Sequence, residues 1–316
     1  MEGPDYHLVQ RLVGRWAVWR PIVGVVSLFV VFFVIGPFVA LIPFLIGYGI
    51  SGADLADTAT RLADIDHVTP SSLAYLNLAL SIAIPIGLFL TWALHGLRPG
   101  WISSVIGRLR WRWMAVTFGL AFVALLATVV VGSFVPAAGD PADSSGSLNS
   151  WTDTTRDFVI VIVLLTPLQA AGEEYAFRGY LTQAFGGLFQ SRVAAVLIPA
   201  VLFALAHGAQ DAPVFVDRLA FGIVAGILVI ATGGLEAGIA MHVLNNFLAY
   251  GFALAFSDMT TALNPTGGSW WTLPTTLTQS LVYLALAIWA ARRMGVARSV
   301  DRGAAPNVLE GSERRV

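Results

Sequence analysis

The chain has 316 residues, of which 57% are hydrophobic and only 12% are charged, with a formal net charge of −1. Soluble globular domains carry about 25% charged residues, so this chain has too little charge to cover a water-exposed surface. The near-zero net charge gives no reason to expect a nucleic acid partner. Cysteine is absent, which excludes disulfides, thiolate metal sites and a cysteine nucleophile. The composition predicts a membrane protein.

Apolar segments long enough to cross a bilayer recur along the chain. A membrane-spanning helix needs about 20 mostly apolar residues, and such a segment must be helical because its backbone groups have to be satisfied internally. We therefore predict an all-α polytopic membrane protein with about eight spans. The first span lacks the short apolar core and cleavage site of a signal peptide. The predicted spans are 21–49, 72–95, 113–136, 156–185, 192–208, 217–234, 238–256 and 272–292.

Charges between the predicted spans are unevenly distributed. Arginines gather before the first span, between the second and third, and after the last, whereas aspartates gather after the first and third. Arginine-rich loops stay in the cytoplasm, so both termini are predicted to be cytoplasmic in a multi-pass plasma membrane protein. An even number of spans also places both termini on the same side of the membrane. The aspartates are Asp54, Asp57, Asp64, Asp66, Asp140, Asp143 and Asp153.

The pattern divides the chain into three parts. Residues 1–154 are expected to form an N-terminal membrane region of three helices, with arginine- and tryptophan-bearing stretches before the first span and at 101–113 lying along the interface. Residues 155–295 hold the other predicted spans. Residues 296–316 have the glycine, proline and mixed charge of a disordered cytoplasmic tail. No internal repeat is evident, which disfavours transporters built from duplicated halves.

Ionisable residues away from the ends of the predicted spans all lie in the second half of the chain. They are Glu173, Glu174, Arg178, His207 and His242. An ionisable group at membrane depth costs at least about 2.5–3.5 kcal/mol on insertion scales, so such groups usually face a polar cavity and act there. These residues are therefore the candidate functional site.

The spacing of the acidic residues separates their roles. On a helix Glu174 and Arg178 are i and i+4 and can pair along one face. Glu173 lies about 100° around the helix, outside that pair. A carboxylate held away from a counter-charge in apolar surroundings is suited to general-base work. The alternative is a structural charge cluster that joins helices.

The two histidines each have a partner one helical turn away. His207 follows Phe203 at i+4, and His242 is followed by Asn245 at i+3 and Asn246 at i+4. Imidazole and amide groups can orient a water and stabilise the oxyanion that forms when water attacks a carbonyl. The predicted spans place His207 near the outer side and His242 near the inner side, so one site requires helices that tilt or span boundaries that move, with residues 186–191 entering the membrane.

Three motifs thus follow one another in order: EExxxR at 173–178, FxxxH at 203–207 and HxxxN at 242–246. With this order on membrane helices, the chain resembles the CAAX-protease and bacteriocin-processing family (CPBP, or ABI-type) of intramembrane endopeptidases. The resemblance covers about residues 155–255. It implies that 155–295 is a protease core that hydrolyses peptide bonds of membrane-associated protein or peptide substrates.

The resemblance also implies a role for each motif position. Glu173 with His207 would activate the water. His242 with Asn246 would stabilise the oxyanion. Glu174 and Arg178 would support Glu173. Phe203 and Asn245 would have supporting positions.

A metal is the main alternative within this chemistry. Glu173, His207 and His242 match the His₂Glu set of catalytic zinc sites. However, the sequence has no HExxH motif, and Asn246 is a poor zinc ligand that serves better as a donor. A glutamate and a histidine suffice to activate water, so we expect a mechanism without a cofactor, with zinc as the alternative.

Two other functions fit the same residues. Membrane glutamate, arginine and histidine also build proton relays, as in a proton- or ion-coupled transporter. A non-catalytic membrane scaffold or immunity-type protein could keep the fold and bind a partner. Each of these functions predicts the lipid bilayer as a partner. The endopeptidase function also predicts a membrane-associated protein or peptide as substrate.

Overall fold

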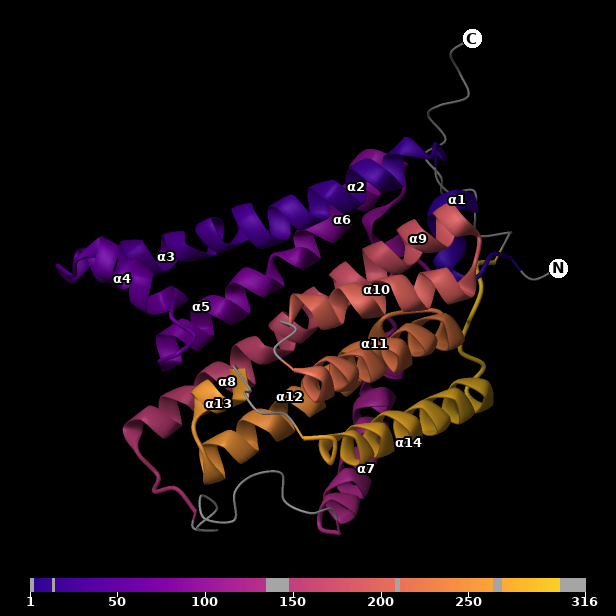
Figure 1. Ribbon diagram of the computed structural model, residues 1–316. Helices are drawn as coiled ribbons and strands as arrows, with labels where there is room; N and C mark the ends of the chain where they lie inside the picture. The colour runs from indigo at the N-terminus through magenta and orange to yellow at the C-terminus, as the bar shows by residue number, and fades with distance from the viewer. Residues whose placement is uncertain (1–2, 13–14, 135–147, 208–210, 264–268, 302–316) are drawn as a thin grey trace.

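A computed structural model of the chain describes residues 3–12, 15–134, 148–207, 211–263 and 269–301. Within these ranges the chain forms helices and no named strand. Most of the long helices run along one direction of the bundle, and the described ends, residues 3 and 301, lie at the same end of it (Figure 1). The prediction of an all-α polytopic membrane protein is confirmed.

The helices of the N-terminal half include two short 3₁₀ helices, η1 and η3, and one π-helical segment, η2. In chain order they are η1 (Tyr6–Leu8), α1 (Val9–Leu12), α2 (Trp19–Val30), η2 (Val31–Ile35), α3 (Gly36–Ile50), α4 (Leu55–Ala63), α5 (Pro70–Ser81), α6 (Ala83–His95), η3 (Pro99–Ile102) and α7 (Trp111–Gly132).

The C-terminal half contains a second π-helical segment, η4, which continues α8 without a break. Its helices are α8 (Asp153–Glu173), η4 (Glu174–Leu181), α9 (Thr182–Phe189), α10 (Arg192–Ala206), α11 (Ala212–Thr232), α12 (Glu236–Phe256), α13 (Met259–Leu263) and α14 (Thr272–Arg293).

Seven helical runs among the described residues are long and apolar enough to cross a membrane. They are Trp19–Ile50, Pro70–His95, Trp111–Gly132, Asp153–Phe189, Ala212–Thr232, Glu236–Phe256 and Thr272–Arg293.

The fifth predicted span, 192–208, differs from the other seven. It corresponds to α10, which has 15 residues and is about 22 Å long. That is shorter than the bilayer core of about 30 Å. Helix α10 is therefore too short to cross the bilayer core upright, whereas α11, which packs against it, is one of the seven full-length runs.

Polar caps fix where the helices around the site begin. Thr152 accepts a hydrogen bond from the Thr155 amide before α8, and Ser191 accepts one from the Ala194 amide before α10. Asp211 accepts one from the Val214 amide, so α11 begins at Ala212. The sequence prediction started this helix at 217. The correction places two charged residues, Asp217 and Arg218, inside a membrane helix.

Two further predictions need correction. The stretch 101–113 does not lie along the interface as one amphipathic helix, because it is divided between η3, a loop and the start of α7. Trp101 and Trp113 are buried. After α14, the beginning of the predicted tail packs against the N-terminal segment, where the Val300 amide donates to the carbonyl of Pro4. Asp140, Asp143 and residues 302–316 lie outside the described residues.

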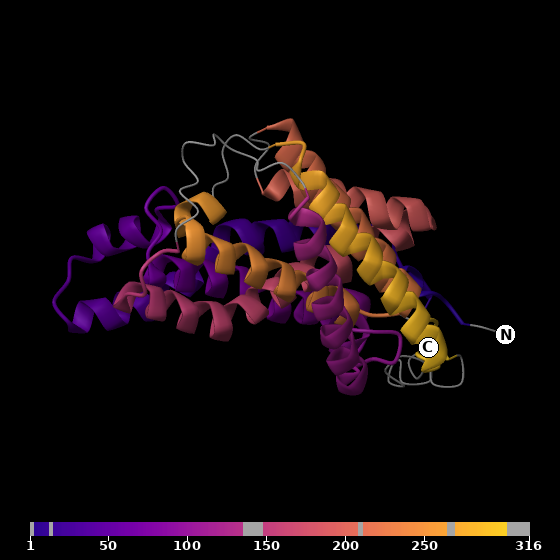
Figure 2. The ribbon, with the colours of Figure 1, turned by 90° about the horizontal axis from the view of Figure 1, so that it is seen from below.

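The core of the second half is built by close helix crossings. Helix α8 packs on α5, and a Cβ atom at Gly172 would lie only 2.4 Å from the carbonyl oxygen of Leu80. Only glycine permits this approach. Helices α7 and α14 cross in contact on the other side of α12, which Figure 2 shows from below. These contacts hold α8, α10 and α12 around a buried polar cluster.

Candidate active site

The two adjacent glutamates lie at the junction between α8 and η4. Glu173 is the last residue of α8, and Glu174 is the first residue of the π-helical segment. Both lie near the middle of the continuous run Asp153–Phe189. Segments of π-helix are rare and are found frequently at functional sites.

Glu173 is a buried carboxylate with one oxygen bound and one available. Its side chain accepts a hydrogen bond at Oε1 from Nε2 of Gln169, at 2.8 Å. Its Oε2 atom lies 3.5 Å from Nε2 of His242 and 4.0 Å from Nε2 of His207. Oε2 has no hydrogen-bond partner among the described residues, and Glu173 is only 5% exposed. Two imidazoles therefore flank a carboxylate oxygen that can accept a further hydrogen bond.

Glu174 forms the ion pair that its spacing predicts. Its Oε1 lies 3.1 Å from Nη1 of Arg178 and 3.0 Å from Nδ1 of His242. Arg178 is 1% exposed, and its guanidinium lies 4.0 Å over the ring of Phe203. This cation–π contact compensates part of the cost of burying the cation. On the α12 side the carboxylate is closely packed, because a Cβ atom at Gly238 would lie 2.6 Å from Oε2 of Glu174.

His242 is held by the same ion pair. A carboxylate can only accept, so Nδ1–H of His242 donates to Glu174. The ring makes edge contacts with Phe221 and Phe203, at centroid distances of 5.2 and 6.0 Å. Its other nitrogen, Nε2, is thereby directed at Glu173. Carboxylates that orient a functional imidazole through its second nitrogen are a common feature of enzyme sites.

His207 comes from the end of α10 and is the most accessible member of the cluster, with 30% of its side chain exposed. Its Nδ1 lies 2.8 Å from the carbonyl oxygen of Phe203, and the ring packs on the Phe203 ring at 4.3 Å. Because the carbonyl only accepts, Nδ1 carries the proton and Nε2 is left as an acceptor facing Glu173. Because Nε2 of His207 lies 4.0 Å from Oε2 of Glu173, the end of α10 meets the middle of the run Asp153–Phe189, as a single site requires.

Asn246 is connected to the cluster through a residue that the sequence analysis missed. Its Nδ2 donates to Oε1 of Gln169 at 2.9 Å, and Gln169 in turn donates to Glu173. Gln169 is buried and lies one helical turn before Glu173. That i−4 position within an apolar stretch is a signal that could have identified it.

Asn245 lies elsewhere. It lines a cavity of about 710 Å³ between α7, α11, α12 and α14, together with Asp217, Arg218 and Gln279. Oδ1 of Asp217 and Nε2 of Gln279 are buried and lack a hydrogen-bond partner in the part of the chain that the structure describes. The Asp217 carboxylate also pairs with Arg218 through Oδ2, at 3.2 Å. The cavity is thus polar on one side although membrane helices form its walls.

The donor set contains the chemistry of a zinc site but not its arrangement. Glu173, His207 and His242 are suitable zinc ligands by type. Over the described ranges, however, no three histidine, cysteine, aspartate or glutamate side chains are placed to hold a metal ion.

Comparison with known proteins identifies the region that carries these motifs. Residues 155–248 match the family model described as type II CAAX prenyl endopeptidase Rce1-like. We call residues 155–248 the Rce1-like region, because it is similar to that family. The Rce1-like region extends from the first turn of α8 into α12 and contains every residue of the cluster.

A second comparison extends beyond the Rce1-like region. Over 191 residues the chain is 27% identical to the protein named "Uncharacterized protein YyaK" of Bacillus subtilis (strain 168). The alignment covers 56% of this chain and 62% of that relative, so the chain spans less than two thirds of the relative's length. No solved structure matches the chain.

Proposed function

We propose that the chain is an intramembrane endopeptidase in which Glu173 activates water for attack on a peptide bond. The observation that carries this proposal is the Oε2 atom of Glu173, which is buried, unpartnered among the described residues and flanked by two imidazoles. The Rce1-like region supports peptidase chemistry, and the membrane helices around it support a membrane-associated protein or peptide as substrate.

The first step is water activation. A water oxygen about 2.8 Å from both Oε2 of Glu173 and Nε2 of His207 would donate one hydrogen bond to each. Glu173 then takes a proton as the water oxygen bonds to the carbonyl carbon. In the second step the protonated carboxyl gives this proton to the leaving nitrogen as the C–N bond breaks. The partial exposure of His207 provides the side from which water and substrate reach the carboxylate.

The oxyanion is assigned to His242 and Asn246. Since Nδ1–H of His242 is donated to Glu174, the ring can donate from Nε2 only when it carries both protons. Glu174, which lies 3.0 Å from Nδ1, would compensate the charge of that form. Asn246 uses one N–H on Gln169, and its second N–H is the one that we assign to the oxyanion. These two donors would stabilise the negative oxygen of the tetrahedral intermediate.

The polar cavity beside α12 supports a place for the substrate segment. A peptide must be unwound to be cleaved, and unwound backbone groups in a membrane need protein partners. Asp217 offers an acceptor and Gln279 a donor for such groups. We expect Asp217→Asn with Gln279→Leu to slow cleavage about tenfold, as for a lost hydrogen bond. Thr278→Val, on α14 but outside the cavity lining, is the control and should have no effect.

The experiment that tests the proposed function can be done before any substrate has been identified. New protein N-termini are quantified in membranes of cells that express the wild-type chain or Glu173→Gln. We expect N-termini that appear with the wild type and disappear with Glu173→Gln. The control is Asp153→Asn, which removes an exposed carboxylate from the same helix. Identical N-termini for the wild type and Glu173→Gln would reject the proposal and favour a transporter or a scaffold.

We also propose that both termini are cytoplasmic, in the plasma membrane. Both described ends lie on one side of the bundle, where the arginines before α2, after α6 and at the end of α14 are found (Figure 1). Labelling of single cysteines at positions 3 and 301, in the otherwise cysteine-free chain, tests this orientation in intact cells. Labelling of both by a membrane-impermeant reagent before lysis would contradict it.

A further inference from the structure

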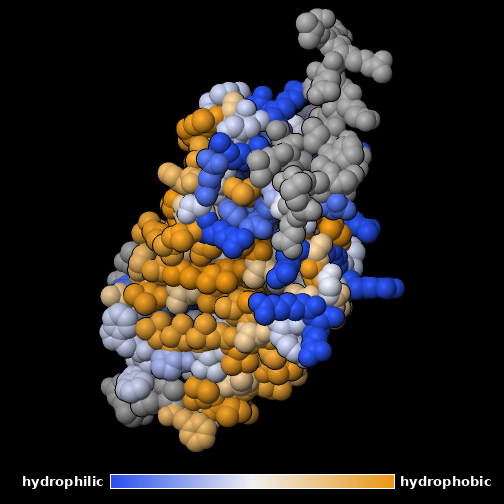
Figure 3. Space-filling view, turned by 90° about the vertical axis from the view of Figure 1, so that its right-hand side faces the viewer, coloured by the Kyte–Doolittle hydropathy of each residue, from blue (hydrophilic) through white to orange (hydrophobic). Residues whose placement is uncertain are grey.

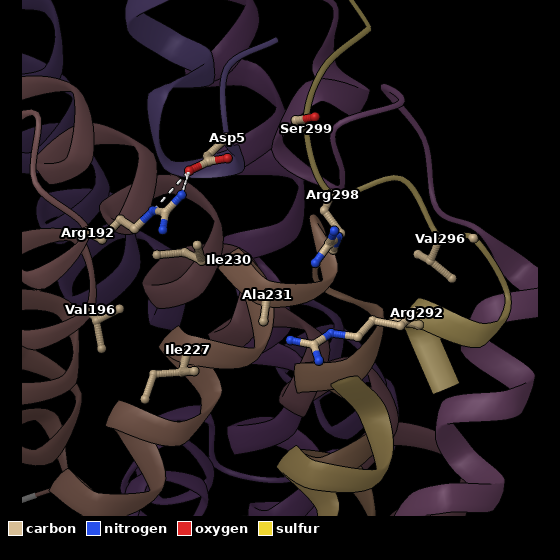
Figure 4. A pocket seen from close by; sticks show the side chains of 12 residues that line it. Asp5, Arg192, Val196, Ile227, Ile230, Ala231, Arg292, Val296, Arg298 and Ser299 are labelled. Atoms are coloured by element: carbon tan, nitrogen blue, oxygen red, sulfur yellow. Dashed lines mark hydrogen bonds and ion pairs between the residues drawn. The ribbon is translucent and has the colours of Figure 1, made fainter. Parts of the chain in front are cut away.

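A second hollow lies at the end of the bundle that carries the chain ends, apart from the catalytic cluster. Its volume is about 690 Å³, and its walls come from α10, α11, α14 and the segment that follows α14 (Figure 4). None of the motif residues lines it. This pocket therefore needs an explanation separate from the proposed peptidase activity.

Three guanidinium groups from three different elements surround the pocket. They belong to Arg192 at the start of α10, Arg292 at the end of α14, and Arg298 in the following segment. Arg192 donates to the carboxylate of Asp5. The side chains of Arg292 and Arg298 form no hydrogen bond or ion pair with any described residue. Three cations share one carboxylate, so the pocket has an excess of positive charge that favours an anion.

The floor of the same pocket is apolar. Val196 on α10 and Ile227 and Ile230 on α11 line it. Ile227 is exposed, and so is Leu197 on the outer side of α10, so the apolar floor continues onto the surface of the bundle. Figure 3 shows this end of the molecule, with hydrophilic side chains directly beside a hydrophobic flank. A small inorganic anion would use the arginines and leave the apolar floor without a partner.

The depth of the pocket agrees with a lipid. Arg192 is the first residue of α10, and Arg292 is the second-last residue of α14. Arginines at the ends of apolar helices lie at the level of the lipid head groups. Basic pockets between membrane helices at this level are suited to anionic head groups, because the phosphate meets the cations while the chains stay in the bilayer.

We propose that this pocket binds an anionic phospholipid, with its phosphate between Arg192, Arg292 and Arg298 and an acyl chain along Ile227. The bound lipid links the start of α10 to the end of α14. The lipid thereby fixes the start of α10, whose other end carries His207.

Binding is tested on the full chain in detergent by native mass spectrometry, with phosphatidylglycerol and phosphatidylcholine of the same acyl chains. We expect phosphatidylglycerol to bind at least about tenfold more tightly, and the double variant Arg292→Gln, Arg298→Gln to weaken that binding roughly 30-fold. Arg293→Gln is the matched control, because Arg293 is exposed on the same helix but does not line the pocket. Both arginines of the double variant are exposed, and its melting temperature without lipid should equal that of the wild type.

A competition measurement distinguishes the phosphate of a lipid from free inorganic phosphate. We expect millimolar inorganic phosphate to leave phosphatidylglycerol bound. Release of the lipid by phosphate alone would assign the pocket to free phosphate and contradict the proposal that it binds a lipid. Equal binding of the two lipids, or an equal loss in Arg293→Gln, would overturn the site itself. None of these results depends on cleavage, so the proposed function and the lipid site can fail separately.

Discussion

Nδ1 of His242 lies 3.0 Å from Oε1 of Glu174, while Nε2 of the same ring lies 3.5 Å from the preceding glutamate. Consecutive residues of an α-helix point about 100° apart, yet here both reach one imidazole from two sides. The change from α8 to the π-helical segment occurs between these two residues. The altered winding and the central position of the ring together fix Glu173 relative to His242.

Removal of the buried cation should destabilise the fold more than removal of an exposed one. Arg178→Met leaves Glu174 buried without its arginine, and breaking such a pair costs about 3–5 kcal/mol. We expect a large fall in the melting temperature of the protein in detergent. Arg156→Met, which breaks only exposed ion pairs, should cost about 0–1 kcal/mol.

The double variant Glu174→Gln, Arg178→Met gives a further test of that pair. It removes both charges, so much of the stability lost in Arg178→Met should return. A double variant as unstable as Arg178→Met would show that the stacking of the guanidinium on Phe203, rather than the ion pair, holds this part of the fold.

Gly238 has no side chain, and this makes room for the carboxylate of Glu174. In Gly238→Ala the new Cβ would lie 2.6 Å from Oε2 of Glu174, so the carboxylate must move away and release His242. We expect cleavage to fall roughly 100-fold, as for a misplaced catalytic group. Gly251→Ala on the same helix is the control, because nothing lies within 4 Å of its Cβ. Equal activity of the two variants would contradict the proposed placement of His242.

Metal removal is expected to leave cleavage unchanged. The described residues offer no three-ligand arrangement, and the proposed water activation uses only Glu173 and His207. Purified protein is dialysed against a chelator, and its zinc content is compared with its cleavage of a substrate identified from the new N-termini. Stoichiometric zinc that is lost in His207→Ala, with parallel loss of activity in the dialysed wild type, would favour the zinc alternative.

Spacing along a single helix was enough to predict part of the site. The pair Glu174–Arg178 follows from i and i+4 on one face, and it survives in the π-helical segment because residues four apart remain close there. The spans also followed from apolar length, apart from α10. Its shortness depends on where the chain turns, and the cap Ser191 fixes only its start.

Contacts between helices were beyond the same reasoning. Gln169 could be placed one turn before Glu173, but its bond to Asn246 depends on how α8 crosses α12. The sequence prediction placed Asp217 at the start of a helix, because it began the helix where the apolar stretch begins. The N-cap that starts α11, Asp211, lies several residues earlier. Trp101 has the composition of an interfacial anchor, yet tertiary packing buries it. In each case a side chain's partner comes from a distant segment.

The link from Asn246 through Gln169 to Glu173 separates two roles for Asn246. If Asn246 acts as an oxyanion donor, Asn246→Leu and Gln169→Leu remove different contributions, and their effects on cleavage should add in the double variant. If it acts by positioning Glu173, the double variant should be no slower than the worse single one. We expect near-additive losses, about 100-fold for Asn246→Leu and about tenfold for Gln169→Leu.

The control for this cycle is Asn245→Leu, which alters the neighbouring amide. Asn245 lines the other cavity, whereas the hydrogen bond to Gln169 comes from Asn246. The effect of Asn245→Leu should be additive with Gln169→Leu whichever role Asn246 has. Melting temperatures of all variants separate lost activity from lost folding. Full non-additivity of the Asn246 and Gln169 changes would remove Asn246 from the oxyanion site, and it would make Gln169 the residue through which α12 sets the orientation of Glu173.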